Sequence, residues 1–287
     1  MQPILENLVA LLALERIDRD LFRGTSQDLG WGAIFGGQVL GQALSAATQT
    51  VAPDRAAHSA HGYFIRAGEL QRPIVYEVDR LRDGKSFSTR RVVAVQEGEA
   101  IFSLEASFHV EETGLDHQDA MPAVPAPESV PSEQELALAV ASSLPEALRA
   151  RATAARPIEI RPVEPRNPLA PTVQAPSRRL WYRVVDRLPD DPALHRYLLA
   201  YASDFSFLGT ALDPHGVSFL TRGMQVASVD HAIWFHRPFR ADDWLLYDVE
   251  SPTAAGARGL VRGRFFDRAG RLVASAVQEG LIRKRQA

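Results

Sequence analysis

The sequence predicts an α+β protein made of two similar halves, in each of which an antiparallel sheet wraps a central helix. Two observations lead to this prediction. A helix-like segment followed by a series of strand-like runs occurs twice along the 287 residues. Shifting the second half by 171 residues also aligns identical residues: Phe64 with Phe235, Arg66 with Arg237, Tyr76 with Tyr247 and Val78 with Val249. After one inserted residue, Ser103 aligns with Ser275.

The first half is expected to contain two helices and four strands. The first 17 residues have the apolar periodicity of an amphipathic helix, and residues 35–51 predict a helix that is opened by two glycines and closed before Pro53. Strands are predicted at 58–66, 73–81, 86–96 and 100–110, with hairpin turns at 83–86 and 97–98. In the last strand, apolar and polar residues alternate, which is typical of a half-buried antiparallel strand.

The middle of the chain has a different composition. Eleven of the nineteen prolines lie between Pro122 and Pro176, so residues 113–177 predict a long connection, with a helix near 133–151 capped by Ser132. The pattern then resumes with a helix at 192–204 and strands at 179–186, 224–237, 243–250, 258–267 and 271–283. We therefore expect a first repeat over 1–112, the connection over 113–177, and a second repeat over 178–287.

The pentapeptide A-V-Q-E-G occurs at 94–98 and again at 276–280. These two segments are 182 residues apart, so they do not correspond in the alignment of the halves. Gln96 is expected at the tip of a hairpin. Gln278 is expected within a strand, where it aligns with Ala106 on the inward face. The identity is therefore a coincidence, and the two glutamines have different roles.

Composition limits the classes of function. The net charge of −3 gives no basis for nucleic-acid binding. Thirty of the 32 basic residues are arginine, which suits a phosphorylated ligand but is explained more simply by a bias of the source genome. The absence of cysteine excludes disulfides and thiolate sites and fits a reducing compartment. With neither a signal peptide nor an apolar run of membrane-spanning length, the sequence predicts a cytoplasmic protein.

Candidate functional residues are polar residues at positions where the pattern requires apolar ones. Gln278 is one, and Asp204 is another, because it continues a helical stripe with Tyr197 and Tyr201. An alternative for Asp204 is a residue that turns outward where the helix ends. Ser228 lies on a strand face of mixed character, where a structural role is the simpler interpretation.

Histidine pairs and familiar motifs do not indicate a metal or nucleotide site. His231 and His236 are expected on opposite faces of one strand, as are His58 and His61, so neither pair predicts a metal site. The chain has no G-x-S-x-G motif, and its D-G-K-S and G-W-G-A-I-F-G-G segments fail the spacing of phosphate-binding loops.

Several long motifs together resemble the acyl-CoA thioesterase II family of bacteria and peroxisomes. They are F-R-G-T-S-Q-D-L-G, F-G-G-Q-V-L-G-Q-A-L, Y-E-V-D-R-L-R-D-G-K-S-F-S-T-R-R-V, L-L-A-Y-A-S-D-F-S-F-L, D-H-A-I-W-F-H-R-P-F and L-V-A-S-A-V-Q-E-G. The resemblance covers nearly the whole chain, including the proline-rich connection. It implies a double hotdog fold, in agreement with the repeat, and hydrolysis of fatty acyl-CoA without a metal or an organic cofactor. The C-terminal R-K-R-Q-A is not a peroxisomal address, so the cytoplasm remains the expected compartment.

The resemblance also implies a catalytic trio, which falls on Asp204, Ser228 and Gln278. Such a trio holds a water that attacks the thioester carbonyl. Relatives often have threonine at the middle position. Serine keeps the hydroxyl and loses a methyl group, so we expect function to be retained with a weaker restriction of the rotamer. The resemblance assigns no histidine beside Ser228, so Ser228 need not be a covalent nucleophile.

The repeat leads to a hypothesis about the other half of the site. Aligning the two central helices at a shift of 159 places Ser45 opposite Asp204, and Gly36-Gly37 opposite His195-Arg196. We therefore expect one composite site per chain, in which the trio faces backbone amides near Gly36, Gly37 and Gln38 that polarise the thioester carbonyl. The alternative is that these glycines serve only close helix packing.

Other functions and partners remain open at this point. A hydratase or dehydratase of the same fold would use an Asp–His pair, and a non-catalytic acyl-CoA or lipid binder would bind without turnover. Candidates for contacting the CoA phosphates are Arg66, Arg82 and Arg237, which are equally explicable as solvated strand residues. Since double hotdog proteins commonly pair further, we expect a homodimer or homotetramer.

Overall fold

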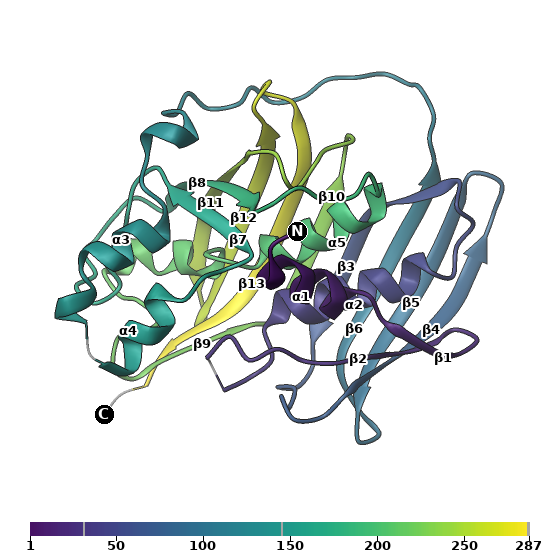
Figure 1. Cartoon of the computed structure of the whole chain (residues 1–287), viewed down its shortest axis with the longest axis horizontal. Coiled ribbons are helices and arrows are strands. Elements are labelled where there is room, and N and C mark those ends of the chain that lie inside the picture. Colours follow the sequence, from purple (N-terminus) through teal and green to yellow (C-terminus); the bar gives the residue numbers. More distant parts are fainter. Residues whose placement is uncertain (31, 145, 286–287) are drawn as a thin grey trace.

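The computed structural model describes residues 1–30, 32–144 and 146–285, so the last two residues of R-K-R-Q-A lie outside it (Figure 1). The chain begins with α1 (Pro3–Leu12), β1 (Glu15–Asp18) and β2 (Leu21–Gly24). The first repeat then contains α2 (Gly36–Thr48), β3 (Arg55–Phe64), β4 (Ile74–Asp83), β5 (Phe87–Gln96) and β6 (Glu99–Val110). The helix and all four strands expected here are confirmed, with shifts of at most a few residues at their ends.

The connection and the second repeat follow. The connection holds α3 (Glu133–Ala139), α4 (Glu146–Thr153), β7 (Ile158–Pro162) and two short 3-10 turns, Pro127–Ser129 and Ala141–Ser143. The second repeat contains β8 (Ser177–Val184), α5 (Pro192–Ser203), two 3-10 turns (Leu208–Ala211, Asp213–His215), β9 (Met224–Ser228), β10 (Asp230–Phe235), β11 (Leu245–Ala255), β12 (Arg258–Asp267) and β13 (Leu272–Lys284).

One continuous antiparallel sheet of the described residues runs through both halves, in the order β1-β2-β4-β5-β6-β3-β10-β13-β12-β11-β8-β7, with β9 beside β13. The halves join where β3 pairs with β10, with Ala60 opposite Ile233. The helices α2 and α5 lie side by side within the curve of this sheet (Figure 1). The α+β architecture of two helices wrapped by antiparallel sheet is confirmed.

The internal repeat is visible in the details of the hydrogen bonding. In the first half, the Arg66 amide donates to the Ile101 carbonyl, and its side chain donates to the neighbouring carbonyl, that of Ala100, at 2.8 Å. In the second half, the Arg237 amide donates to the Val273 carbonyl, and its side chain donates to that of Leu272 at 2.7 Å. Aligned residues therefore make the same contacts, and the duplication read from the sequence is confirmed.

Two predicted elements are each divided in the structure. The helix expected over 133–151 is two helices separated by a 3-10 turn, because the serine pair at 142–143 has low helix propensity. Its predicted cap is correct: the Ser132 side chain accepts a hydrogen bond from the Glu135 amide at 3.1 Å. The strand expected over 224–237 breaks at Val229, and only its second part, β10, pairs with β3. Ser228 therefore ends β9 and does not belong to one continuous alternation with Asp230.

The helices α2 and α5 approach each other closely enough that glycine is required at their crossing. A Cβ atom placed on Gly37 would lie 2.3 Å from the Tyr201 carbonyl oxygen of α5. Real Cβ atoms do not approach backbone oxygens this closely, so any larger residue forces the two helices apart. This close packing brings the start of α2 against the end of α5, where the candidate site lies.

Candidate active site

Asp204 caps the C-terminal end of α5, and its carboxylate turns inward toward α2. The side chain is partly buried, and Oδ2 accepts a hydrogen bond from the Gly37 amide at 2.9 Å. The alternative of a residue that turns outward is therefore wrong. Since Gly37 is the second residue of α2, the positive end of the helix dipole faces the carboxylate. Asp204 of the second half therefore lies in direct contact with the start of α2 in the first half, as a composite site of two halves requires.

The three backbone amides expected to polarise the substrate carbonyl differ in the structure. The Gly37 amide is already used by Asp204, and the Gln38 amide donates to the Phe35 carbonyl at 3.0 Å. Among the described residues, no group accepts a hydrogen bond from the Gly36 amide, which opens α2 beside the carboxylate. A Cβ atom on Gly36 would lie 2.8 Å from Oδ2 of Asp204, so the absence of a side chain keeps this corner open. Gly36 is therefore the amide best suited to a substrate.

Gln278 and Ser228 meet on neighbouring strands. Gln278 points inward from β13 and is fully buried, as its alignment with the equally buried Ala106 predicts. Its amide nitrogen donates to the Ser228 hydroxyl at the end of β9, and the side chain lies close enough to Asp204 to lower the pKa of that carboxyl group. The structure therefore brings the three predicted residues together around one amide group. The other glutamine, Gln96, ends β5 and bonds backbone groups of Glu69 and Arg72, so its different role is confirmed.

A histidine that sequence reasoning did not assign to the site lies directly behind Gln278. His231 is fully buried on β10, and its Nδ1 lies 3.0 Å from Oε1 of Gln278. Its Nε2 lies 2.9 Å from the hydroxyl of Ser203, the last residue of α5. His231 is buried and His236 is exposed, in keeping with the prediction that they do not form a metal site, but His231 is a neighbour of the trio that the sequence analysis did not assign. The available signal was the one that identified Gln278, a polar residue on the inward face.

Burial and local charge shift the pKa values of the two titratable groups in opposite directions. Burial raises the pKa of Asp204 above its usual value, against the lowering effects of His231, Gln278 and the Gly37 amide. Burial lowers the pKa of His231, against the raising effects of Asp204 and Gln278. A carboxylate with a raised pKa is better able to accept a proton from water at neutral pH.

Aromatic side chains surround this corner of the protein. The ring of Phe35 stacks on Phe205 with centroids 4.3 Å apart and meets Tyr201 edge to face at 5.2 Å. Phe64 lies against Gly36, and the ring of Phe207 packs near that of His231, with ring centroids 5.6 Å apart. Such apolar walls strengthen electrostatic interactions within the site by excluding water.

The hydrogen bonds and ion pairs of the arginines considered for CoA binding involve residues outside the trio. Arg66 pairs with Glu99 at 2.8 Å, and Arg237 pairs with Asp116, in addition to their matching bonds to hairpin carbonyls. These contacts account for both residues as hairpin supports. Arg82 is exposed near the end of β4. A role for any of the three in binding CoA stays a prediction.

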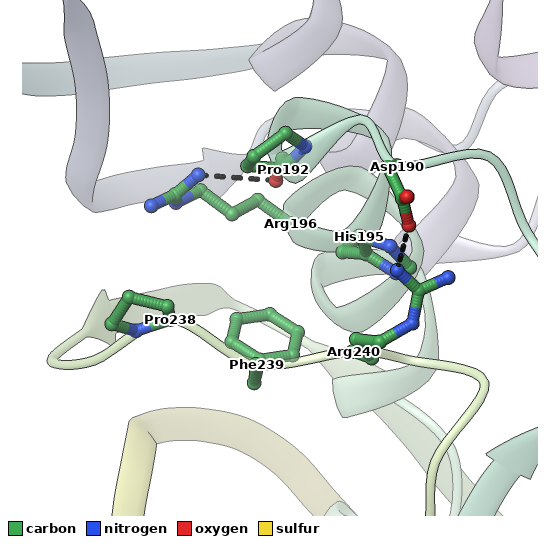
Figure 2. A pocket seen from close by; sticks show the side chains of 7 residues that line it. All are labelled: Asp190, Pro192, His195, Arg196, Pro238, Phe239 and Arg240. Carbon is green, nitrogen blue, oxygen red and sulfur yellow. Dashed lines mark hydrogen bonds and ion pairs between the residues drawn. The ribbon is translucent and has the colours of Figure 1, made fainter.

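A cavity of about 180 Å³ lies at the start of α5 (Figure 2), whereas Asp204 caps the other end of this helix. It is lined by Asp190, Pro192, His195, Arg196, Pro238, Phe239 and Arg240. None of the trio lines it. His195 and Arg196 align with Gly36 and Gly37, so this cavity occupies the corner that mirrors the candidate site. In the alignment of the halves, Ser45 and Ala106 correspond to Asp204 and Gln278, so the first repeat has no counterpart of the catalytic acid or of the glutamine amide.

In the residues that the structure describes, no cluster of three or more His, Asp or Glu side chains has the arrangement of a metal site. No helix of that same part of the chain has the length and apolar character needed to cross a membrane.

Comparisons with known proteins agree with this architecture. A family model described as acyl-CoA thioesterase matches residues 147–281, and a model of the acyl-CoA thioesterase N-terminal domain matches residues 25–109. The chain is 47% identical to acyl-CoA thioesterase 2 of Haemophilus influenzae, over 99% of both chains. It is 42% identical to acyl-coenzyme A thioesterase 8 of Homo sapiens, over 96% of this chain and 88% of that protein.

Solved structures give the same result. An acyl-CoA thioesterase II from Mycobacterium marinum superposes with a TM-score of 0.78 at 43% identity, over 97% of this chain and 99% of the other. A protein with a hot dog fold from Alicyclobacillus acidocaldarius superposes with a TM-score of 0.77 at 20% identity, over 98% and 99% of the two chains. That second likeness supports the fold alone, which is a double hotdog.

Proposed function

Since the chain belongs to the acyl-CoA thioesterase family and is a thioester hydrolase, we propose that it hydrolyses fatty acyl-CoA with a water held by Asp204, Ser228 and Gln278. The observation that carries this proposal is the position of the Gln278 amide, which donates to the Ser228 hydroxyl and lies close enough to Asp204 to lower the pKa of its carboxyl group. A water between these groups has an acceptor for its proton and a neighbour to fix its lone pair.

In the proposed reaction, Asp204 accepts a proton as the water oxygen attacks the thioester carbonyl carbon. The carbonyl oxygen becomes an oxyanion, to which the Gly36 amide at the start of α2 donates. When the tetrahedral intermediate collapses, the carbon–sulfur bond breaks. The proton passes from Asp204 to the departing thiolate, giving free fatty acid and CoA thiol.

His231 bears on the rival reaction of a hydratase or dehydratase, which would use an Asp–His pair. Both ring nitrogens of His231 are engaged, one with Ser203 and the other with Gln278. Neither nitrogen is then available to exchange a proton with a substrate carbon. This arrangement favours hydrolysis over hydration, although a histidine does lie beside the carboxylate.

A pair of substitutions at Ser228 tests the proposed site. We expect Ser228→Ala to lower kcat by about 10- to 1000-fold, because one group that orients the water is lost. Ser228→Thr keeps the hydroxyl and should stay within about threefold of wild type, since its extra methyl mainly restricts the rotamer. The measurement is release of CoA thiol from acyl-CoA substrates of graded length. The chain has no cysteine, so a thiol reagent reports only the product.

The possible results distinguish an error in the assignment of Ser228 from an error in the proposed hydrolysis. Equal rates for the Ala and Thr variants and wild type would remove Ser228 from the proposed trio. If wild-type protein binds acyl-CoA but releases no thiol from any substrate of the series, the catalytic proposal fails and a binding function replaces it.

A further inference from the structure

The strongest feature outside the proposed trio is the hydrogen-bonded chain behind it. We infer that His231 is a positioning residue that holds the Gln278 amide in the one orientation in which its nitrogen donates toward Asp204 and Ser228. This inference rests on the proposed function, because it concerns how the same site is kept in working order.

The first step concerns the two ends of the Gln278 amide. An amide presents an oxygen that only accepts and a nitrogen that only donates. The Gln278 nitrogen donates to the Ser228 hydroxyl, and it therefore faces the side of the site on which Asp204 lies, where an ionised carboxylate only accepts. A flipped amide would turn its oxygen toward the carboxylate, so Gln278 could no longer donate to the Ser228 hydroxyl or to the water. Correct orientation is therefore a condition for the proposed mechanism.

The second step identifies what prevents the flip. With its nitrogen toward Asp204, the amide presents Oε1 to Nδ1 of His231 at 3.0 Å. Both atoms are fully buried, so no water can replace the contact, and an unsatisfied pair there would be costly. Nδ1 must therefore carry a hydrogen. A flipped amide would then set its own N–H against that N–H, so the Nδ1–H tautomer selects the orientation that faces Asp204.

The third step concerns the other ring nitrogen. When the ring is neutral and Nδ1 carries the hydrogen, Nε2 is an acceptor that needs a donor. The Ser203 hydroxyl lies 2.9 Å from Nε2 and 2.8 Å from the Ala200 carbonyl oxygen, and its single hydrogen can be given to either. It therefore accommodates a neutral ring by donating to Nε2 and a protonated ring by donating to Ala200, while the contact with Oε1 of Gln278 requires the hydrogen on Nδ1. Nδ1–H still faces Gln278 in both states, and the amide orientation is preserved in both.

The ring itself is not placed to react. Its two nitrogens are bonded to Ser203 and Gln278, and the Gln278 side chain lies between it and Ser228. His231 therefore acts through Gln278. A role of this kind predicts a loss of turnover without a matching loss of substrate binding.

The test compares substitutions at His231 that keep or remove the donor. In His231→Ala the donor to Oε1 is lost, and we expect kcat to fall by about 10- to 100-fold with little change in KM. This fall in kcat is smaller than the one expected when a group that contacts the reacting atoms is removed. In His231→Asn the side-chain amide places an N–H near the position of Nδ1, so most of the lost kcat should return. In His231→Gln the N–H lies near Nε2, and kcat should stay close to that of the alanine variant.

A double-mutant cycle shows whether His231 acts through the amide. If it does, His231→Ala combined with Gln278→Ala should turn over no more slowly than Gln278→Ala alone. Losses that multiply would overturn the inference, as would a wild-type kcat in His231→Ala. If Gln278→Ala itself keeps wild-type kcat, the proposed site fails, and this outcome is distinct from failure of the His231 inference alone.

A matched control and a direct readout protect the test from effects on folding. His195 is the control, because it is also a buried histidine whose Nδ1 is hydrogen-bonded. It lies near the start of α5, away from the trio, and its Nδ1 accepts from the Ala241 amide at 3.0 Å. His195→Asn should change melting temperature without changing kcat.

In wild-type protein, ¹⁵N NMR should find hydrogen on Nδ1 of His231. A neutral ring with a bare Nδ1 would overturn the inference even if the alanine variant does not fold.

Discussion

Replacement of Asp204 by asparagine should slow release of CoA thiol by at least about a hundredfold, the scale of a general base, and raise the stability of the protein at neutral pH. Asparagine has nearly the same shape, and its carbonyl oxygen can still accept from the Gly37 amide. It cannot accept a proton from water. The loss should therefore fall on kcat, with acyl-CoA still bound.

The gain in stability follows from the direction of the pKa shift. Burial raises the pKa of Asp204 in the folded protein, so between the unfolded value near 3.8 and the folded value the native state binds more protons than the unfolded state. The free energy of unfolding then falls as pH rises through that interval. Above the folded pKa, wild type bears the full cost of the buried charge, and Asp204→Asn does not. Asp204 thus supports turnover while it lowers the free energy of unfolding, which is a trade-off between activity and stability.

Thermal unfolding between pH 4 and pH 8 measures this effect. The melting temperature of Asp204→Asn should exceed that of wild type at pH 7, and the difference should narrow as the pH falls toward 4. A variant that is less stable than wild type at pH 7 would show that the ionised carboxylate stabilises the fold. A variant with undiminished kcat would remove Asp204 from the mechanism.

Gly37→Ala should damage folding and turnover together. The added methyl group would lie 2.3 Å from the Tyr201 carbonyl oxygen and 2.6 Å from the ring of Phe35, so α2 and α5 must separate. Overpacking of this kind costs about 1–3 kcal/mol of unfolding free energy. The separation also pulls the Gly37 amide away from Asp204, so we expect kcat to fall by about two orders of magnitude, as when one preorganised donor is lost.

Gly41→Ala is the matched control for this substitution. Gly41 faces α5 one turn further along α2, where a Cβ atom would lie 3.1 Å from the Tyr197 carbonyl oxygen and 3.0 Å from a flexible Leu12 methyl group. A small loss of stability with nearly normal kcat is expected there. Chemical denaturation and thiol release measure both variants. Equal effects of the two substitutions on kcat would mean that general loosening of the helices, rather than the Gly37–Asp204 contact, limits turnover.

The fold was predictable from the sequence to the extent that its elements are long and periodic. The paired halves, both central helices and the nine predicted strands, which correspond to β3–β6 and β8–β13, follow from hydrophobic periodicity and the 171-residue shift. The strands β1, β2 and β7 were not predicted, because four or five residues are too few to establish an alternation. The break at Val229 was also missed, since local pattern does not reveal where a strand changes partners.

The site shows the same division between pattern and three-dimensional contact. Gln278 and Asp204 stood out as polar residues in apolar stripes. Ser228 depended on the family resemblance, because the break beside it obscures which way its side chain points. His231 carried the same signal as Gln278 but was considered only as a metal ligand. The Gly37 amide donates a hydrogen bond to Asp204. This contact depends on how closely α2 and α5 approach each other, and no local pattern in the sequence indicates that distance.

The contact between Gly37 and Asp204 joins residues 167 positions apart. Contacts of such sequence separation require a long loop to be closed, which costs conformational entropy. The two halves meet where β3 pairs with β10. Because the proposed site combines Gly36 and Gly37 of one half with Asp204, Ser228 and Gln278 of the other, we expect a chain in which only one half is folded to be inactive toward thioesters. Activity in this molecule reports that the whole chain has reached its native state.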